Sequence, residues 1–165
     1  MTSSSTDFLS TGHRVIRREA GALETLAEVR DESFSKAVGL LMAAKGRVIV
    51  SGMGKSGHIA RKLAATLAST GTPAFYVHPG AAGHGDLGMI TDPDIVLALS
   101  NSGETDELVT LLPVLARQGN QLIAMTGGPQ STLARRADAH IDASVPAEAC
   151  PLDLAPTSST TAALV

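Results

Sequence analysis

The chain has 165 residues, of which 44% are hydrophobic and 18% charged, and its formal net charge at pH 7 is −3. This length favours a single domain with a sizeable core, and the composition is ordinary for a globular protein. The slight negative charge gives no sign of nucleic acid or an anionic membrane as a partner, and no apolar run reaches membrane-spanning length. The single cysteine, Cys150, excludes a disulfide within the chain and favours a reducing, cytoplasmic location.

The N-terminal region is predicted to contain a tail followed by helix. Residues 1–12 are rich in Ser and Thr and lack the basic and apolar pattern of a secretion signal, so we expect a flexible tail over residues 1–13. Apolar residues then recur at helical spacing over residues 14–45. A break near Asp31-Glu32-Ser33 would divide this region into two helices. The expected role is packing or oligomerisation rather than chemistry.

A glycine-rich turn follows the first predicted strand, residues 47–51, and precedes a helix. Residues 52–57 match the Gly-x-Gly-x-x-Gly pattern of dinucleotide-binding proteins, which is a weak signal by itself. That pattern also needs an acidic residue at the end of the next strand, here residues 73–77, and the chain continues instead with His78-Pro79-Gly80. We therefore discount a nicotinamide cofactor, and we expect no other cofactor.

The same turn does not match the phosphate loop of ATP-binding proteins, because that loop requires a glycine where this chain has Ile49. What remains is a turn that presents Gly54, Lys55 and Ser56 at the carboxyl end of a strand. Open α/β sheets bind their ligands at that end. The alternative interpretation of Lys55 is a lysine that contacts only water, but the constrained, exposed turn weakens that interpretation.

A turn rich in hydroxyl groups follows the third predicted strand, residues 95–99, and precedes a helix predicted over residues 107–115. The turn contains Ser100, Asn101, Ser102 and Thr105. Backbone N–H groups in the first turn of a helix lack partners and carry a partial positive charge, so an anion such as phosphate fits there. The alternative is that one hydroxyl only caps the helix. Three hydroxyls and a glycine within six residues favour a phosphate site.

The loop after the second strand, residues 78–88, contains four glycines and two histidines, which is unusual for a simple connection. His78, His84 and Asp86 are compatible with metal ligands, but no cluster of Cys or Glu supports a dedicated metal site. We therefore predict no metal, with adventitious zinc at His84 as the exception. A catalytic or sugar-contacting role for His84 is the preferred interpretation.

The remaining elements complete an alternating pattern. Strands are predicted over residues 121–125 and 139–143, and a last helix begins near residues 156–160. That helix is expected to be cut, because residues 161–165 are apolar and carry no stop signal. Alternating strands and helices indicate a three-layer α/β/α sandwich with a five-stranded parallel sheet, the flavodoxin-like class.

Several motifs, taken together and in order, resemble the sugar isomerase (SIS) domain of bacterial D-arabinose-5-phosphate isomerases. The resemblance covers about residues 14–165. The motifs are residues 52–58, 78–80, 84–88, 100–104, 148–152 and 155–160. This resemblance implies the interconversion of D-ribulose 5-phosphate and D-arabinose 5-phosphate, which supplies the 3-deoxy-octulosonate (KDO) sugar of lipopolysaccharide. It also implies a homotetramer whose active sites are shared between subunits.

The resemblance assigns roles that agree with the chemistry of aldose–ketose exchange. That reaction needs a base, a donor or cation beside an oxyanion, and a phosphate that positions the reacting carbons. Lys55 would polarise the carbonyl, Glu148 is the first choice for the base and Glu107 the second, and His84 would assist proton transfers. A surface charge is the competing interpretation of Glu107. The phosphate or sugar hydroxyls would be held by Gly54, Ser56, Ser100, Asn101, Ser102, Thr105, Ser158 and Ser159.

Two features depart from the family pattern. Ala81 stands where the family usually has an acidic residue. The resemblance also implies that the chain ends within the final helix, before a further active-site histidine and the pair of CBS domains that most members carry. Low activity of this chain is therefore one expectation. A sugar-phosphate sensor without catalysis is the alternative function, although both Lys55 and Glu148 are retained and pure binding does not need a base. Another phosphosugar isomerase is a third alternative, because fold does not determine substrate.

Overall fold

The computed structural model describes residues 7–28, 32–83, 85–152 and 154–165. Its centre is a five-stranded sheet of the order β2-β1-β3-β4-β5 in which every pair of neighbours is parallel. This confirms the predicted class of fold. The strands are β1 (Val48–Gly52), β2 (Ala74–Val77), β3 (Ile95–Leu99), β4 (Gln121–Thr126) and β5 (Ala139–Asp142).

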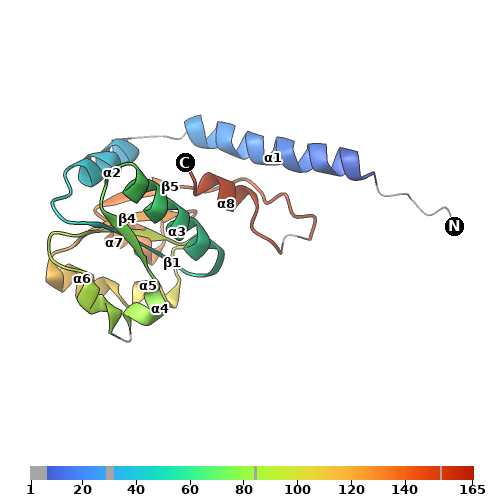
Figure 1. Ribbon diagram of the computed structural model, residues 1–165. Helices are drawn as coiled ribbons and strands as arrows, with labels where there is room; N and C mark the ends of the chain where they lie inside the picture. Colours follow the sequence, from blue (N-terminus) through green and yellow to red (C-terminus); the bar gives the residue numbers. More distant parts are fainter. Residues whose placement is uncertain (1–6, 29–31, 84, 153) are drawn as a thin grey trace.

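Helices cover both faces of the sheet (Figure 1). Alternate side chains of β1 show this clearly, because Val48 and Val50 pack with α2 and α3, whereas Ile49 packs with the helices of the other face. Both faces of the central strands are therefore buried, which explains their continuous apolar runs. One face carries α2 (Glu32–Met42), α3 (Gly54–Ser69) and α8 (Ser158–Ala162), and the other α4 (Pro79–Ala82), α5 (Asp106–Val109), α6 (Leu112–Gln118) and α7 (Thr132–Arg136). A short 3₁₀ helix, η1 (Asp86–Met89), precedes β3.

The N-terminal helix α1 (Phe8–Glu28) begins earlier than predicted. Asp7 explains this start, because its Oδ1 accepts hydrogen bonds from the N–H groups of Leu9 at 3.1 Å and Ser10 at 3.2 Å. The prediction of a tail is wrong for residues 8–13, and residues 1–6 lie outside the described part of the chain. The division into two helices is confirmed, since α2 begins at Glu32. The amino-terminal half of α1 extends beyond the three layers (Figure 1).

The single helix predicted over residues 107–115 is wrong, because the structure has α5 and α6 there. Pro113 supplies the physical reason. Its ring clashes with the carbonyl of the residue four positions earlier in a continuous helix, and that residue is Val109, where α5 ends. α5 therefore has only four residues.

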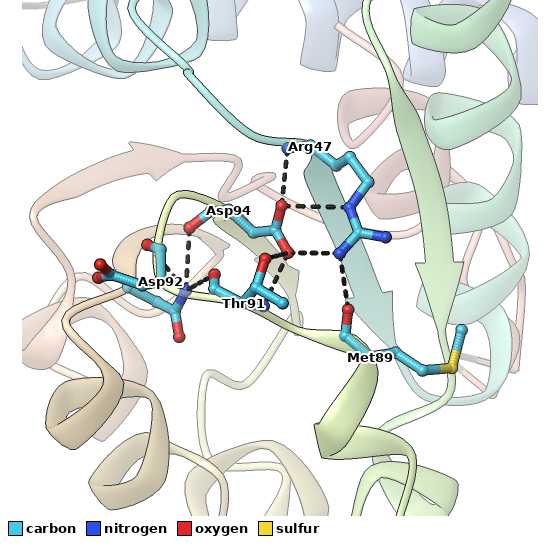
Figure 2. A network of polar contacts seen from close by, with 6 residues as sticks. Arg47, Met89, Thr91, Asp92 and Asp94 are labelled. Atoms are coloured by element: carbon cyan, nitrogen blue, oxygen red, sulfur yellow. Dashed lines mark hydrogen bonds and ion pairs between the residues drawn. The ribbon is translucent and has the colours of Figure 1, made fainter.

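A polar network joins the amino ends of β1 and β3 (Figure 2). The Asp94 side chain is 1% exposed, and its Oδ2 accepts from Arg47 Nη2 at 2.9 Å and Thr91 N at 2.8 Å. Oδ1 accepts from Arg47 N at 2.8 Å, and Arg47 Nη2 also donates to the Met89 carbonyl at 2.8 Å. Burial alone would raise the pKa of Asp94, but the bonds from Arg47 and Thr91 outweigh it and hold the pKa well below its usual range. We call Arg47, Thr91 and Asp94 the sheet clasp.

No helix within the four described ranges is both long and apolar enough to cross a membrane.

Candidate active site

A pocket of about 340 Å³ opens at the carboxyl ends of the strands. It lies where β1 and β3 are neighbours, which is the point at which the strand order of the sheet reverses. Open α/β sheets bind ligands at this point. The lining comes from the turns after β1, β3 and β4 and from residues near α8: Met53, Lys55, Ser56, Ile59, Leu99, Ser100, Asn101, Met125, Thr126, Gly127, Ala143, Glu148, Leu154, Ala155, Pro156, Ser159, Thr160 and Ala163.

The start of α3 brings Lys55 and Ser56 to the pocket. Gly54 has a φ of +52°, a conformation that favours glycine, and α3 begins there without a side-chain cap. Gly57 lets the helix approach β1 closely, because a Cβ at this position would lie 2.6 Å from the Gly52 carbonyl oxygen. The unpaired N–H groups of this 16-residue helix therefore lie at the turn that carries the exposed Lys55. This arrangement attracts an anion.

The turn after β3 contributes Ser100 and Asn101 to the lining, but not Ser102 or Thr105. Instead, the hydroxyls of Ser100 and Thr105 lie 2.7 Å apart, and Ser102 Oγ accepts from Glu104 N at 3.2 Å. Ser100 Oγ also accepts from the Gly103 N–H at 3.0 Å. These bonds hold the turn in shape. Because α5 is one turn long, the start of α3 is the better helix terminus for a phosphate.

Glu148 lines the same pocket and is hydrogen-bonded to the start of α8. Its Oε2 accepts from Thr157 N at 2.7 Å, Thr157 Oγ1 at 2.9 Å and Ser159 N at 3.3 Å. Partial burial raises the pKa of Glu148, but hydrogen bonds from Ser159 and Thr157 outweigh it and lower the pKa below its ordinary value. The carboxylate is therefore ionised at neutral pH and can accept a proton.

The two serines at the start of α8 differ in placement. Ser159 lines the pocket, whereas Ser158 is fully buried and does not. Within the described residues the Ser158 hydroxyl has no hydrogen-bond partner. Gly54 also lies outside the lining, although its neighbour Lys55 belongs to it.

The three predicted catalytic residues that the structure describes do not all lie in one pocket. Lys55 and Glu148 share the pocket, but Glu107 lies on α5 and lines another hollow, with Pro79, Gly80 and Thr110 among its neighbours. His84 lies outside the described residues. Within this chain, therefore, Glu107 is not brought to Lys55. The ranking of Glu148 before Glu107 as the base is consistent with this arrangement but stays a prediction.

Sequence reasoning missed three polar contributions to the site. Thr126 could have been found, because it directly ends a buried strand at the ligand-binding edge of the sheet. Thr160 follows the predicted serines, and Thr157 bonds to Glu148 across nine residues, a contact that no local pattern indicates. Among the described residues, no three His, Cys, Asp or Glu side chains gather in a group that could hold a metal ion.

A parallel sheet covered on both faces, with a pocket at the reversal of strand order, defines an α/β ligand-binding domain. More particularly, the chain belongs to the SIS domain family, which matches residues 40–165. It is 60% identical over 159 residues to arabinose 5-phosphate isomerase KdsD of Pseudomonas aeruginosa, covering 96% of this chain and 49% of that protein. The identity to KdsD of Escherichia coli K12 is 55%, with 96% and 48% covered.

The chain thus spans about half the length of these curated relatives. A solved structure of E. coli CFT073 c3406 in complex with arabinose 5-phosphate has a TM-score of 0.92 and 42% sequence identity to this chain. The match covers 98% of this chain and 86% of that one.

Proposed function

We propose that this chain is the isomerase domain of an enzyme that interconverts D-ribulose 5-phosphate and D-arabinose 5-phosphate. The observation that carries the proposal is that Lys55 and Glu148, from distant parts of the sequence, line one pocket beside the amino end of α3. The similarity to KdsD over 96% of the chain supports the substrate, as does the sugar-phosphate complex of the similar c3406 structure.

The reaction moves protons and an electron pair within the sugar. The Glu148 carboxylate removes the C2 proton of the aldose, the electrons form an enediolate, and the proton returns at C1. The proton of the C2 hydroxyl moves to O1, so that C2 becomes the carbonyl carbon of the ketose. The Lys55 ammonium donates to the oxygen on which negative charge develops. Ser56 and Ser100, with the free N–H groups of α3, bind the phosphate, so that its binding energy positions the reacting carbons. Asn101 and Ser159 contact the sugar hydroxyls.

The proposal extends to assembly and to the pathway. A homotetramer with shared sites would allow a second subunit to supply Glu107 or His84, which the geometry of one subunit does not place beside Lys55. Large apolar side chains at the outer part of α1 support such an assembly, since Phe8, Leu9 and Ile16 are at least 68% exposed. The product would enter KDO synthesis for lipopolysaccharide, in the cytoplasm.

A sugar-phosphate sensor is the second candidate. One observation favours it: the Glu148 carboxylate accepts bonds from the backbone N–H groups of Thr157 and Ser159, as a structural cap of α8 would. In a sensor, the same pocket would bind the phosphate sugar and Glu148 would take no proton.

Substitutions in the pocket test the proposed roles. Lys55→Met and Glu148→Gln are each expected to lower kcat by about 10²- to 10⁴-fold, because each removes a group that acts only in the transition state. Lys62→Met is the matched control, since Lys62 is exposed on the same helix but lies outside the pocket lining. Equal rates for all three variants would contradict the assigned site.

A further inference from the structure

We propose that Thr157 is a positioning residue, whose hydroxyl fixes the Glu148 carboxylate in the pocket. This inference rests on the proposed isomerase function and adds to it a residue that does not itself line the pocket. Thr157 lies just before α8, nine residues after Glu148. It would act on the sugar only through the base.

The hydroxyl of Thr157 bonds in two directions. It donates to Glu148 Oε2 at 2.9 Å and accepts from the Ala149 N–H at 2.7 Å. Together with the bond from Thr157 N to the same carboxylate oxygen at 2.7 Å, these contacts fix both the side chain of Glu148 and the backbone that follows it. A single threonine thus sets the position and the orientation of the proposed base.

The geometry at the start of α8 differs from an ordinary helix cap. Thr157 occupies the cap position, yet its side chain makes no cap bond to the helix. Its hydroxyl is directed instead to Glu148, whose carboxylate takes over the cap by accepting from Thr157 N and Ser159 N. Stabilising α8 alone would not require this exchange. It becomes useful if Glu148 must be held at the pocket wall.

Charged groups on other elements also face this segment. Lys55 of α3 shares the pocket with Glu148, and Arg18 of α1 donates through Nη1 to the Glu148 carbonyl at 3.1 Å. Glu19 of α1 accepts from the Thr161 hydroxyl at 2.6 Å. A change of the neutral Thr157 leaves all these charges in place. Its effect on Glu148 therefore comes from the lost hydrogen bonds.

The test compares Thr157→Val, which keeps the shape but removes the hydroxyl, with Thr157→Ser, which keeps the hydroxyl. For the valine variant we expect kcat to fall about 10- to 100-fold, with KM changed by less than about 3-fold. The acidic limb of its pH profile moves to higher pH, because the carboxylate loses a donor. Serine restores both properties. Thr161→Val is the matched control, since it loosens α8 without touching Glu148.

A second readout does not depend on turnover. Carbon-13 NMR of the Glu148 carboxyl, assigned with Glu148→Gln, should give a higher pKa in Thr157→Val than in the unaltered chain. If the unaltered chain is active and Thr157→Val leaves the pH profile unchanged, the positioning role alone is overturned. Losses of kcat in Thr161→Val equal to those in Thr157→Val would likewise overturn only the positioning role. An unaltered chain without turnover would overturn the proposed function and, with it, this role.

Discussion

At the scale of single residues, Gly57 determines how closely α3 approaches β1. A Cβ there would lie 2.6 Å from the Gly52 carbonyl oxygen, which Tyr76 also contacts through its hydroxyl at 2.8 Å. Gly57→Ala should lower the free energy of unfolding by about 1–3 kcal/mol and weaken sugar-phosphate binding, because the start of α3 must move. Urea denaturation and calorimetric titration measure the two effects.

Gly21→Ala is the control for this substitution. Gly21 lies inside α1, and a Cβ there would meet nothing within 4 Å. Alanine should therefore stabilise the chain by about 0.5–1 kcal/mol through helix propensity. Equal effects of the two substitutions would show that close packing at Gly57 does not matter.

Local sequence patterns located part of the site but not all of it. Lys55 and Ser100 were predictable because Lys55 lies in the glycine-rich turn after β1 and Ser100 directly follows β3, and the ends of parallel strands meet at one edge of the sheet. The hydrogen bond between Glu148 and Thr157 could not be predicted, since it depends on how the irregular segment between these two residues folds back. The position of Glu107 in a separate hollow likewise depends on packing between helices.

At the scale of elements, the sheet clasp holds the amino ends of β1 and β3 together. Asp94→Asn should lower the free energy of unfolding at pH 7 by about 2–4 kcal/mol. The substitution removes a buried carboxylate that accepts bonds from the charged Arg47 side chain and from the backbone N–H groups of Arg47 and Thr91. Chemical denaturation measures this loss. Asp92→Asn is the matched control on the same loop, since Asp92 is exposed.

The effect of Asp94 should also depend on pH. Its pKa is lowered in the folded state from an ordinary value of 3.8. The carboxylate therefore contributes stability above pH 3.8, and that contribution is lost as the pH falls toward the folded-state pKa. The difference between the unaltered chain and Asp94→Asn should narrow below about pH 4. A constant difference from about pH 7 to about pH 3 would contradict this account of the clasp.

The strands were predictable to within one or two residues, because continuous apolar runs such as Ile95–Leu99 are buried on both faces. The helices on the face of the sheet that carries α4 to α7 were harder to predict. An apolar pattern continues through Pro113, so periodicity alone joined α5 and α6. Asp7, which caps the start of α1, lies inside the predicted tail, where the polar composition concealed its role.

At the scale of the whole molecule, the outer part of α1 is the surface proposed for assembly. Ile16 is 68% exposed there. Ile16→Gln should lower the mass of the assembled species, as measured by light scattering during size-exclusion chromatography, because an apolar contact between copies is lost. Arg17→Gln, at an exposed neighbouring position, should leave the mass unchanged. A monomeric unaltered chain would rule out this surface as a contact between copies.

The proposed reaction is tested most directly by incubating the unaltered chain with D-ribulose 5-phosphate in deuterated water and following the sugar by NMR. We predict conversion to D-arabinose 5-phosphate with deuterium at C2, because the new C–H bond receives a proton that has exchanged with solvent at the base. Saturable binding of the sugar phosphate without conversion or deuterium exchange would contradict the isomerase function and favour the sensor function.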